Sequence, residues 1–96
     1  MGDRPGADAL APLPARNPKV AARVINGEAM ILTPHDSVLH TLNPVATRIW
    51  ELLPTHQTVQ ALVGALAAEY EAAPDEIERD VNELVAALVE RQILQG

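Results

Sequence analysis

From residue 44 onwards, apolar residues recur at every third or fourth position along the chain. This spacing is typical of helices with one buried face, and it predicts helices over Pro44 to Leu53, Val59 to about Glu71 and Pro74 to Arg91. Asn43 and Thr58 precede the first two helices as N-caps, because their side-chain oxygens can accept a hydrogen bond from a free backbone N–H of the first turn. Pro44 and Pro74, at the start of the first and third helices, add to the signal, since the missing N–H of proline costs nothing at the first helical position.

Before residue 44, the apolar positions follow the shorter period of β-strands. Val20 to Ile25 and Glu28 to Thr33 flank Asn26-Gly27, which is the strongest short-range hairpin signal because both turn residues tolerate a positive φ. A two-residue turn pairs Ile25 with Glu28 and thereby fixes the register of the other pairs. Val38 to Leu42 predicts a third strand that passes directly into the first helix. One face of the hairpin carries Ala22, Val24, Ala29 and Ile31, and the other carries Arg23, Ile25, Glu28, Met30 and Leu32.

The order of these elements predicts an α+β fold, in which a three-stranded antiparallel sheet is followed by three helices as in a winged helix-turn-helix. Ile93-Leu94 is expected to fold back as a short extended tail. Because no fourth strand follows the third, at least one edge of the sheet stays open. An open edge offers unpaired backbone donors and acceptors to another chain, so it is the first indication of function.

Two regions are predicted along the chain, a flexible N-terminal arm over residues 1–18 and a domain over residues 19–96. The arm holds four of the eight prolines and two of the five glycines, and it has no sustained apolar period. Such a segment is expected to be ordered only where it touches the domain or a neighbouring molecule.

Composition narrows the classes of protein that are possible. Aromatic residues make up only 2% of the 96 residues, so the core must be built from aliphatic side chains, with Trp50 as its largest piece. The absence of cysteine excludes disulfides, zinc–thiolate sites and thiol catalysis. No apolar run approaches the ~20 residues of a membrane span, and the first residues do not resemble a signal peptide. The sequence therefore predicts a cytoplasmic protein without a membrane partner.

The formal net charge of −6 argues against binding to nucleic acid, because such binding depends on cationic contacts with phosphate. A winged helix-turn-helix would place the third helix in the DNA groove. That helix has two arginines and six acids, and like charge would face the phosphates. The acids are Asp75, Glu76, Glu78, Asp80, Glu83 and Glu90.

Catalytic and metal sites are also not indicated. The single serine, Ser37, has no base at a readable spacing, and no glycine-rich phosphate loop is present. His35, His40 and His56 are predicted in a turn, a strand and an interhelical loop, without the spacing of a helical metal site. We therefore expect a protein that is not an enzyme and that carries no cofactor or metal.

Asp80 stands out among the acids, because it immediately precedes Val81 of the apolar stripe of the third helix. Its carboxylate is expected either to play a structural role or to contact a ligand. The structural role would be to cap a neighbouring turn or to pair with Arg48 or Arg23.

An ordered set of residues resembles the pattern of the PqqD family, which comprises small peptide-binding chaperones of ribosomally made, post-translationally modified peptides. The set covers the chain from about residue 20 to residue 94. Its members are Leu42-Asn43, Ile49 to Leu53, Thr58-Val59, Leu62, Leu66, Glu69-Tyr70, Asp80-Val81, Leu84, Leu88 and Ile93-Leu94. The sequence departs from the family at Pro44-Val45-Ala46, where many members have a glycine-rich position, and at Pro54-Thr55, where an Asp-Gly is expected.

The resemblance implies a non-enzymatic protein that captures the leader segment of a precursor peptide and presents it to a modifying enzyme. In the family, the leader adds as a further strand along the third strand, beside the third helix. Carried over to this sequence, the implied peptide-binding residues are Val38, Leu39, His40, Thr41, Leu42, Asp80, Val81, Leu84, Val85 and Leu88. For the helix residues, packing in the core is the competing interpretation.

The expected partners are therefore a leader peptide and a peptide-modifying enzyme, such as a radical SAM enzyme or a lasso-type protease or cyclase. Two other functions stay open. One is a structural or interaction module that forms a homodimer through its open sheet edge. The other is an acidic winged-helix regulator that acts through protein contacts.

Overall fold

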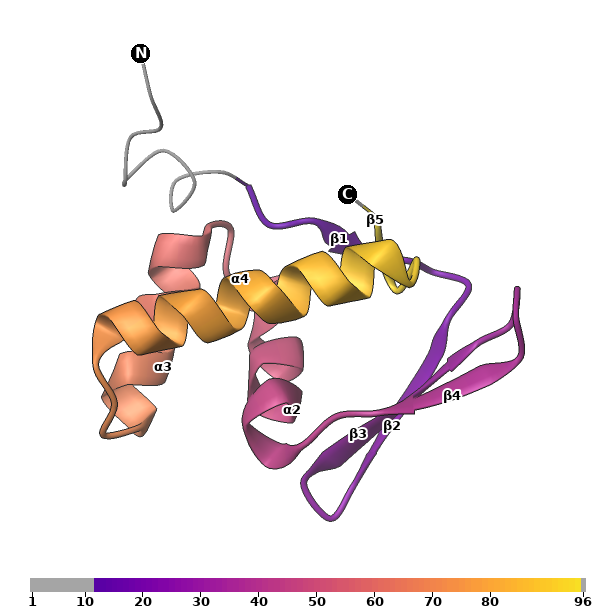
Figure 1. Cartoon of the computed structure of the whole chain (residues 1–96), viewed down its shortest axis with the longest axis horizontal. Coiled ribbons are helices and arrows are strands. Elements are labelled where there is room, and N and C mark those ends of the chain that lie inside the picture. The colour runs from indigo at the N-terminus through magenta and orange to yellow at the C-terminus, as the bar shows by residue number, and fades with distance from the viewer. Residues whose placement is uncertain (1–11, 96) are drawn as a thin grey trace.

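The computed structural model describes residues 12–95 of the chain, and its elements are labelled in Figure 1. A three-stranded antiparallel sheet, ordered β2-β3-β4, precedes three α-helices, which confirms the predicted fold class. A second, two-stranded sheet joins β1 to β5, near the two ends of the described chain. The elements are β1 (Ala15–Arg16), β2 (Ala21–Ile25), β3 (Glu28–Thr33), β4 (Val38–Thr41), α2 (Pro44–Leu52), the 3-10 helix η1 (Leu53–Thr55), α3 (Val59–Glu69), α4 (Pro74–Glu90) and β5 (Leu94–Gln95).

The β2–β3 hairpin has the predicted register, with Ile25 opposite Glu28. Asn26 and Gly27 both adopt the positive φ that a tight turn of this kind requires, at 54° and 78°. On the face of the hairpin that carries Ala22, Val24, Ala29 and Ile31, the two β3 residues Ala29 and Ile31 are fully buried. Ala22 and Val24 of β2 stay exposed, because all of β2 lies beyond the part of the sheet that packs into the core.

The junction between β4 and α2 follows the local chemistry of the sequence. The side chain of Asn43 accepts a hydrogen bond from the Ala46 backbone N–H at 2.8 Å, and Pro44 occupies the first turn. The strand ends one residue earlier than predicted, and Leu42 is buried between strand and helix. A tight connection of this kind fixes where α2 lies relative to the end of the sheet.

The other two helices begin where the sequence predicted. The Thr58 hydroxyl accepts a hydrogen bond from the Ala61 N–H at 3.1 Å at the start of α3, and Pro74 opens α4. The 3-10 turn η1, which contains Pro54, follows α2 directly. Helices α3 and α4 pack against each other and bury one stripe each, so that Figure 1 shows α4 running across the front of α2 and α3. The most deeply buried aliphatic side chains are Ile31, Ile49, Leu62, Leu66, Val81, Leu88, Ile93 and Leu94.

Part of the predicted arm lies against the domain, while residues 1–11 are outside the described residues. The Asn17 N–H donates to the carbonyl of Ile93 at 2.9 Å, beside the β1–β5 pairing. Arg16 places its guanidinium 3.9 Å from the centre of the Trp50 ring and also donates to the Trp50 carbonyl. Partial burial there lowers the pKa of Arg16, which the nearby Glu51 carboxylate opposes. The arm therefore covers Trp50, which is only 2% exposed.

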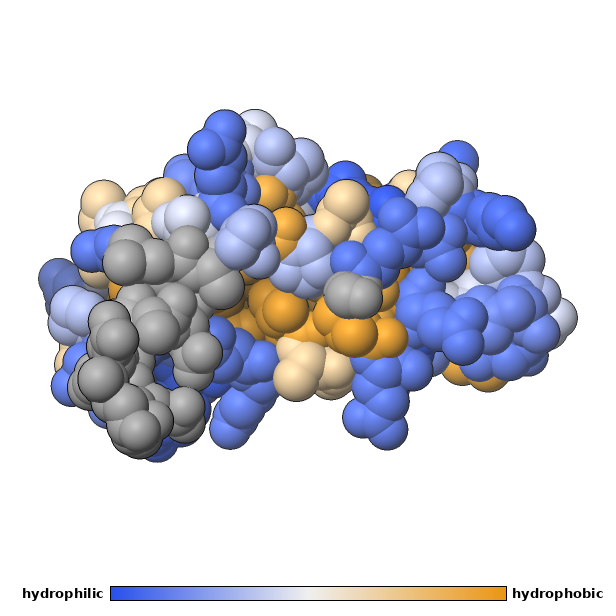
Figure 2. Space-filling model, turned by 90° about the horizontal axis from the view of Figure 1, so that it is seen from above, coloured by the Kyte–Doolittle hydropathy of each residue, from blue (hydrophilic) through white to orange (hydrophobic). Residues whose placement is uncertain are grey.

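The surface seen from above in Figure 2 includes the face on which β1 and β5 lie in Figure 1. An apolar area occupies its middle, with polar side chains on either side. Leu13, Val85 and Val89 are among the half-buried apolar residues that pack on the core. Within the described part of the chain, no helix is both long enough and apolar enough to cross a membrane.

Candidate peptide-binding site

Strand β4 forms one edge of the three-stranded sheet, and only β3 pairs with it among the described residues. The Leu42 N–H donates to the Ala29 carbonyl at 2.9 Å, so the backbone groups of Leu42 point toward β3. In an antiparallel ladder the direction of the backbone groups alternates from one residue to the next. The backbone groups of Val38 and His40 therefore also point toward β3. The N–H and C=O groups of Leu39 and Thr41 therefore point away from the sheet, toward the open edge.

The side chains of β4 alternate between the two faces of the sheet. Val38 and His40 lie opposite Thr33 and Ile31, on the face that packs into the core. Leu39 lies opposite Leu32 on the other face, and these two leucines are 58% and 43% exposed. Leu39, one of the two residues whose backbone groups point outward, thus also exposes an apolar side chain.

A polar cluster holds the amino-terminal end of β4. The Thr33 side chain is fully buried, and its hydroxyl donates to the Asp36 carboxylate and lies 3.2 Å from both the Val38 carbonyl and the His40 Nε2. The hydrogen bond from Thr33 is the main reason why the pKa of Asp36 is lowered, and His35 and His40 add to the effect. This cluster fixes the turn from which the edge strand starts.

Strand β2 forms the opposite edge and is open as well among the described residues. Because Ile25 and Glu28 close the two-residue turn as a hydrogen-bonded pair, the alternation places the free backbone groups of β2 on Ala22 and Val24. The edges differ in their surroundings. Strand β4 leads directly into α2 and a pocket beside it, whereas the residues along β2 are exposed from end to end.

The pocket beside α2 has a volume of about 140 Å³ and lies among three helices. Its walls are mainly apolar, and Asp80 supplies the carboxylate among its lining residues. The lining residues are Val45, Ile49, Leu66, Tyr70, Ala72, Ile77 and Asp80. Of these, only Asp80 was among the predicted binding residues. Val45, Ile49 and Ile77 belong to the apolar positions that recur along the predicted helices. Spacing within one helix, however, does not reveal a hollow between three helices.

The other predicted residues of α4 divide by burial. Val81 and Leu88 are completely buried and belong to the core. Leu84 and Val85 are half-buried and pack on the core from its margin. Of the predicted α4 residues, therefore, Asp80, Leu84 and Val85 are the ones that a bound molecule can reach.

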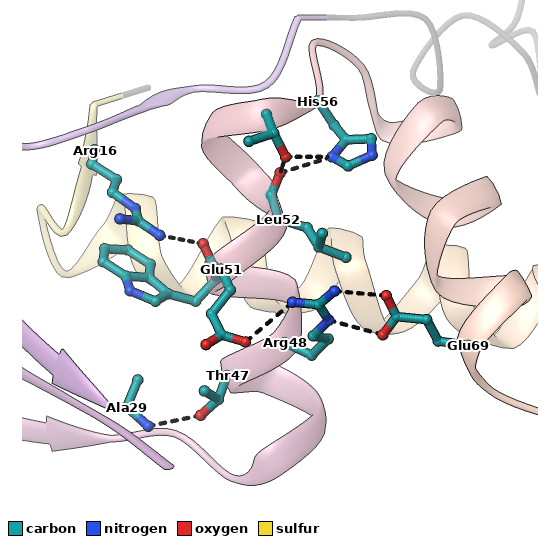
Figure 3. A network of polar contacts seen from close by, with 10 residues as sticks. Arg16, Ala29, Thr47, Arg48, Glu51, Leu52, His56 and Glu69 are labelled. Carbon is teal, nitrogen blue, oxygen red and sulfur yellow. Dashed lines mark hydrogen bonds and ion pairs between the residues drawn. The ribbon is translucent and has the colours of Figure 1, made fainter. Parts of the chain in front are cut away.

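Arg48, one of the two predicted partners of Asp80, is occupied elsewhere (Figure 3). Its guanidinium donates two hydrogen bonds to the Glu69 carboxylate, both at 2.8 Å, and lies 3.4 Å from Glu51. The bond to Arg48 lowers the pKa of Glu69, and the pKa of Arg48 is raised in return. Asp80 makes no ion pair with the described part of the chain, so the alternative in which it pairs with Arg48 or Arg23 was wrong.

The three histidines lie in a turn, in β4 and between η1 and α3, as predicted. Between residues 12 and 95, no group of three His, Cys, Asp or Glu residues is arranged to hold a metal ion.

Comparison with known proteins shows the family to which the chain belongs. The sequence model of the family described as "Coenzyme PQQ synthesis protein D (PqqD)" matches residues 28–94. The chain belongs to the PqqD family. No curated protein matches it.

Two solved structures resemble this PqqD-family chain over nearly its whole described length. The first is TbiB1 in complex with the TbiA(beta) leader peptide, with 28% identity and a TM-score of 0.79, covering 85% of this chain and 95% of that chain. The second is lasso peptide synthetase B1 complexed with the leader peptide, with 24% identity and a TM-score of 0.74, covering 84% and 95%. At 24% identity, the second supports the fold alone.

Proposed function

We propose that this chain is a non-enzymatic adaptor that binds the leader segment of a ribosomally made precursor peptide by strand addition to β4. The observation that carries the proposal is the outward direction of the Leu39 and Thr41 backbone groups at an open sheet edge. A peptide that adds there gains main-chain hydrogen bonds from the edge, and its alternate side chains are read by the surrounding surface. Membership of the PqqD family supports this function, and so does the likeness to TbiB1, which was solved with a leader peptide.

The proposed benefit of binding is the proximity of the substrate to a separate enzyme. A leader held on the adaptor keeps the rest of the precursor close to an enzyme that binds the same complex. Tethering through a short flexible linker raises the local concentration to roughly the millimolar range. The enzyme partner is proposed to be a peptide-modifying enzyme, such as a radical SAM enzyme or a lasso-type protease or cyclase. The adaptor itself supplies binding and no catalytic group.

The first prediction separates the two sheet edges with a pair of proline variants. Leu39→Pro removes an outward N–H of β4, and Val24→Pro removes an outward N–H of β2. Neither change removes a hydrogen bond within the sheet, because both N–H groups point away from it. Proline is tolerated at such positions of an edge strand. The test ligand is the leader peptide of a precursor gene taken from the neighbourhood of this gene. It is titrated into isotope-labelled protein, and binding is followed by NMR. We expect Leu39→Pro to weaken binding by about two- to tenfold, the worth of one hydrogen bond.

Val24→Pro is expected to bind as tightly as the unaltered protein, with shifts in the amides of Val38 to Thr41 on titration. A leader that binds equally well to the Leu39→Pro protein, or that shifts β2 in place of β4, would show that the β4 edge is not the docking strand. Amide spectra of the two free variants check that both remain folded.

A second candidate function is self-association, which is favoured by the exposed apolar residues of the sheet. Leu32 and Leu39 lie side by side on the face that is turned away from the core, and Ile25 on the same face is 43% exposed. A second copy could cover this face or pair with one of the open edges. If the second copy pairs with β4, dimerisation and peptide binding would compete for the same edge.

A further inference from the structure

We propose that the pocket among α2, α3 and the start of α4 binds a lysine or arginine side chain, with its methylene stem between the apolar walls and its charge at Asp80. The inference rests on the proposed function in one respect, namely that the side chain belongs to the peptide added to β4. To that function it adds a preference for lysine or arginine in the part of the peptide that lies near Thr41, at the end of β4.

The size and lining of the pocket fit a single side chain. Its volume of about 140 Å³ is close to that of the ~150 Å³ cavity that accommodates one benzene molecule. The walls come from all three helices and include Val45, Ile49 and Ile77. Val45 is 44% exposed, so the pocket is open to solvent on the side of α2. An unbranched aliphatic stem can fill such a space while its polar end stays near water.

Charge selects the end group of that side chain. Asp80 is exposed, and its neighbours one turn away on the helix surface include Glu76 and Glu83, with no basic residue among them. Arg48 of α2 is held by Glu69 and Glu51. The carboxylate at the pocket is therefore not neutralised by the described part of the chain. A cation that lies there gains an ion pair, whereas an anionic side chain would be repelled.

The position of the pocket connects it with the edge strand. Thr41, the last residue of β4 and one of the two with outward backbone groups, is separated from Val45 by only Leu42, Asn43 and Pro44. A peptide that pairs with β4 and continues past Thr41 is therefore directed toward the start of α2 and the pocket mouth. We expect the cationic residue to lie within a few residues of the one that pairs with Thr41.

The test uses the intact protein and small probes that imitate only the side chain. The probe is n-butylammonium, which reproduces the stem and charge of lysine, and n-butanol serves as its neutral counterpart. Titration followed by amide NMR is expected to give saturable shifts at Tyr70, Ile77 and Asp80, with a dissociation constant on the order of 10 mM for so small a ligand. Butanol is expected to bind about two- to fivefold more weakly, the usual worth of an exposed ion pair.

Two variants identify the charge that is responsible. Asp80→Asn is expected to abolish the difference between the two probes, and the spectrum of the free variant checks its fold. Glu83→Gln, one turn further along α4 and outside the pocket lining, is the matched control and is expected to leave the difference unchanged.

Equal binding of butanol and butylammonium would show a neutral apolar pocket, and the absence of saturable shifts would show no side-chain site. Either result overturns the inference. Neither depends on the leader, because a small probe needs no strand edge and should bind the Leu39→Pro protein normally. Failure of the edge proposal and failure of the pocket proposal are thus separate outcomes.

Discussion

Thr47 shows how one side chain can connect a helix to the end of a sheet. Its hydroxyl accepts a hydrogen bond from the Ala29 N–H at 2.8 Å (Figure 3). The same hydroxyl donates to the Leu42 carbonyl at 3.2 Å. Thr47 therefore bridges the Ala29 N–H and the Leu42 C=O, one residue beyond the last pair of β3 and β4. Thr47 is only 2% exposed, so water cannot replace it. The position of the edge strand relative to α2 depends on this contact.

We expect Thr47→Val to lower the free energy of unfolding by about 1–3 kcal/mol, because the substitution keeps the shape but leaves a buried N–H and a buried C=O without partners. Chemical denaturation measures the change. Thr47→Ser is the control, since it retains the hydroxyl, and it should be clearly more stable than Thr47→Val. Equal stability of the two variants would mean that the bridging hydroxyl contributes nothing.

At the scale of elements, α2 makes contacts with most of the molecule. Trp50 lies beneath Arg16 of β1, Thr47 contacts the sheet, and Arg48 reaches across to Glu69 at the end of α3. The ion pair is exposed, with about two fifths of each side chain accessible to solvent, and pairs of this kind are screened by water and salt. Its effect is best detected through its dependence on pH.

The pH dependence follows from the lowered pKa of Glu69 in the folded protein. A carboxyl whose folded pKa lies below the unfolded value of about 4.3 stabilises the fold at pH values above that value. This contribution is lost as the pH falls through the folded pKa. We therefore expect Glu69→Gln to be less stable than the unaltered protein at pH 7. The difference in urea midpoint should shrink as the pH falls below about 4.3 and vanish below the folded pKa.

Glu71→Gln is the matched control for this measurement. Glu71 is exposed and makes no ion pair with the described residues, so its substitution should leave the midpoint nearly unchanged at every pH. A difference for Glu69→Gln that stays constant from pH 7 to pH 3 would contradict an ionic origin.

At the scale of the whole molecule, the question is whether the exposed sheet serves a peptide or a second copy. In residues 12–95, two open sheet edges and one apolar face allow either. The net charge of −6 opposes association of like molecules, since copies of one chain repel each other. The same charge attracts a basic peptide. The molecule as a whole therefore favours the adaptor function.

We expect sedimentation equilibrium to give the monomer mass of 10.3 kDa at all concentrations tested. A mass that rises toward twice this value would favour the self-association candidate. Two variants then locate the interface. Leu32→Glu would return the protein to a monomer if the apolar face forms the dimer, and Leu39→Pro would do so if the β4 edge forms it.

The sequence by itself determined the features that depend on neighbouring residues. The Asn26-Gly27 turn fixed the hairpin register, and Asn43 and Thr58 fixed where two helices begin, because turn and cap chemistry acts over only a few residues. The same is true of the helix stripes, which placed Val81 and Leu88 in one buried row. The PqqD-family pattern could be recognised for this reason, since it is made of local signals in a fixed order.

The tertiary structure decided which residues from different elements meet. In the folded chain Arg48 pairs with Glu69, and Asp80 lines a pocket together with Val45. The sequence alone was equally compatible with a pair between Arg48 and Asp80. The tertiary structure also brought part of the predicted arm onto Trp50. Such contacts depend on how helices and strands pack in three dimensions, and many pairings of charges along a chain are equally compatible with its periodicity. Only packing chose among them, and it therefore decided what lies beside the open edge of β4.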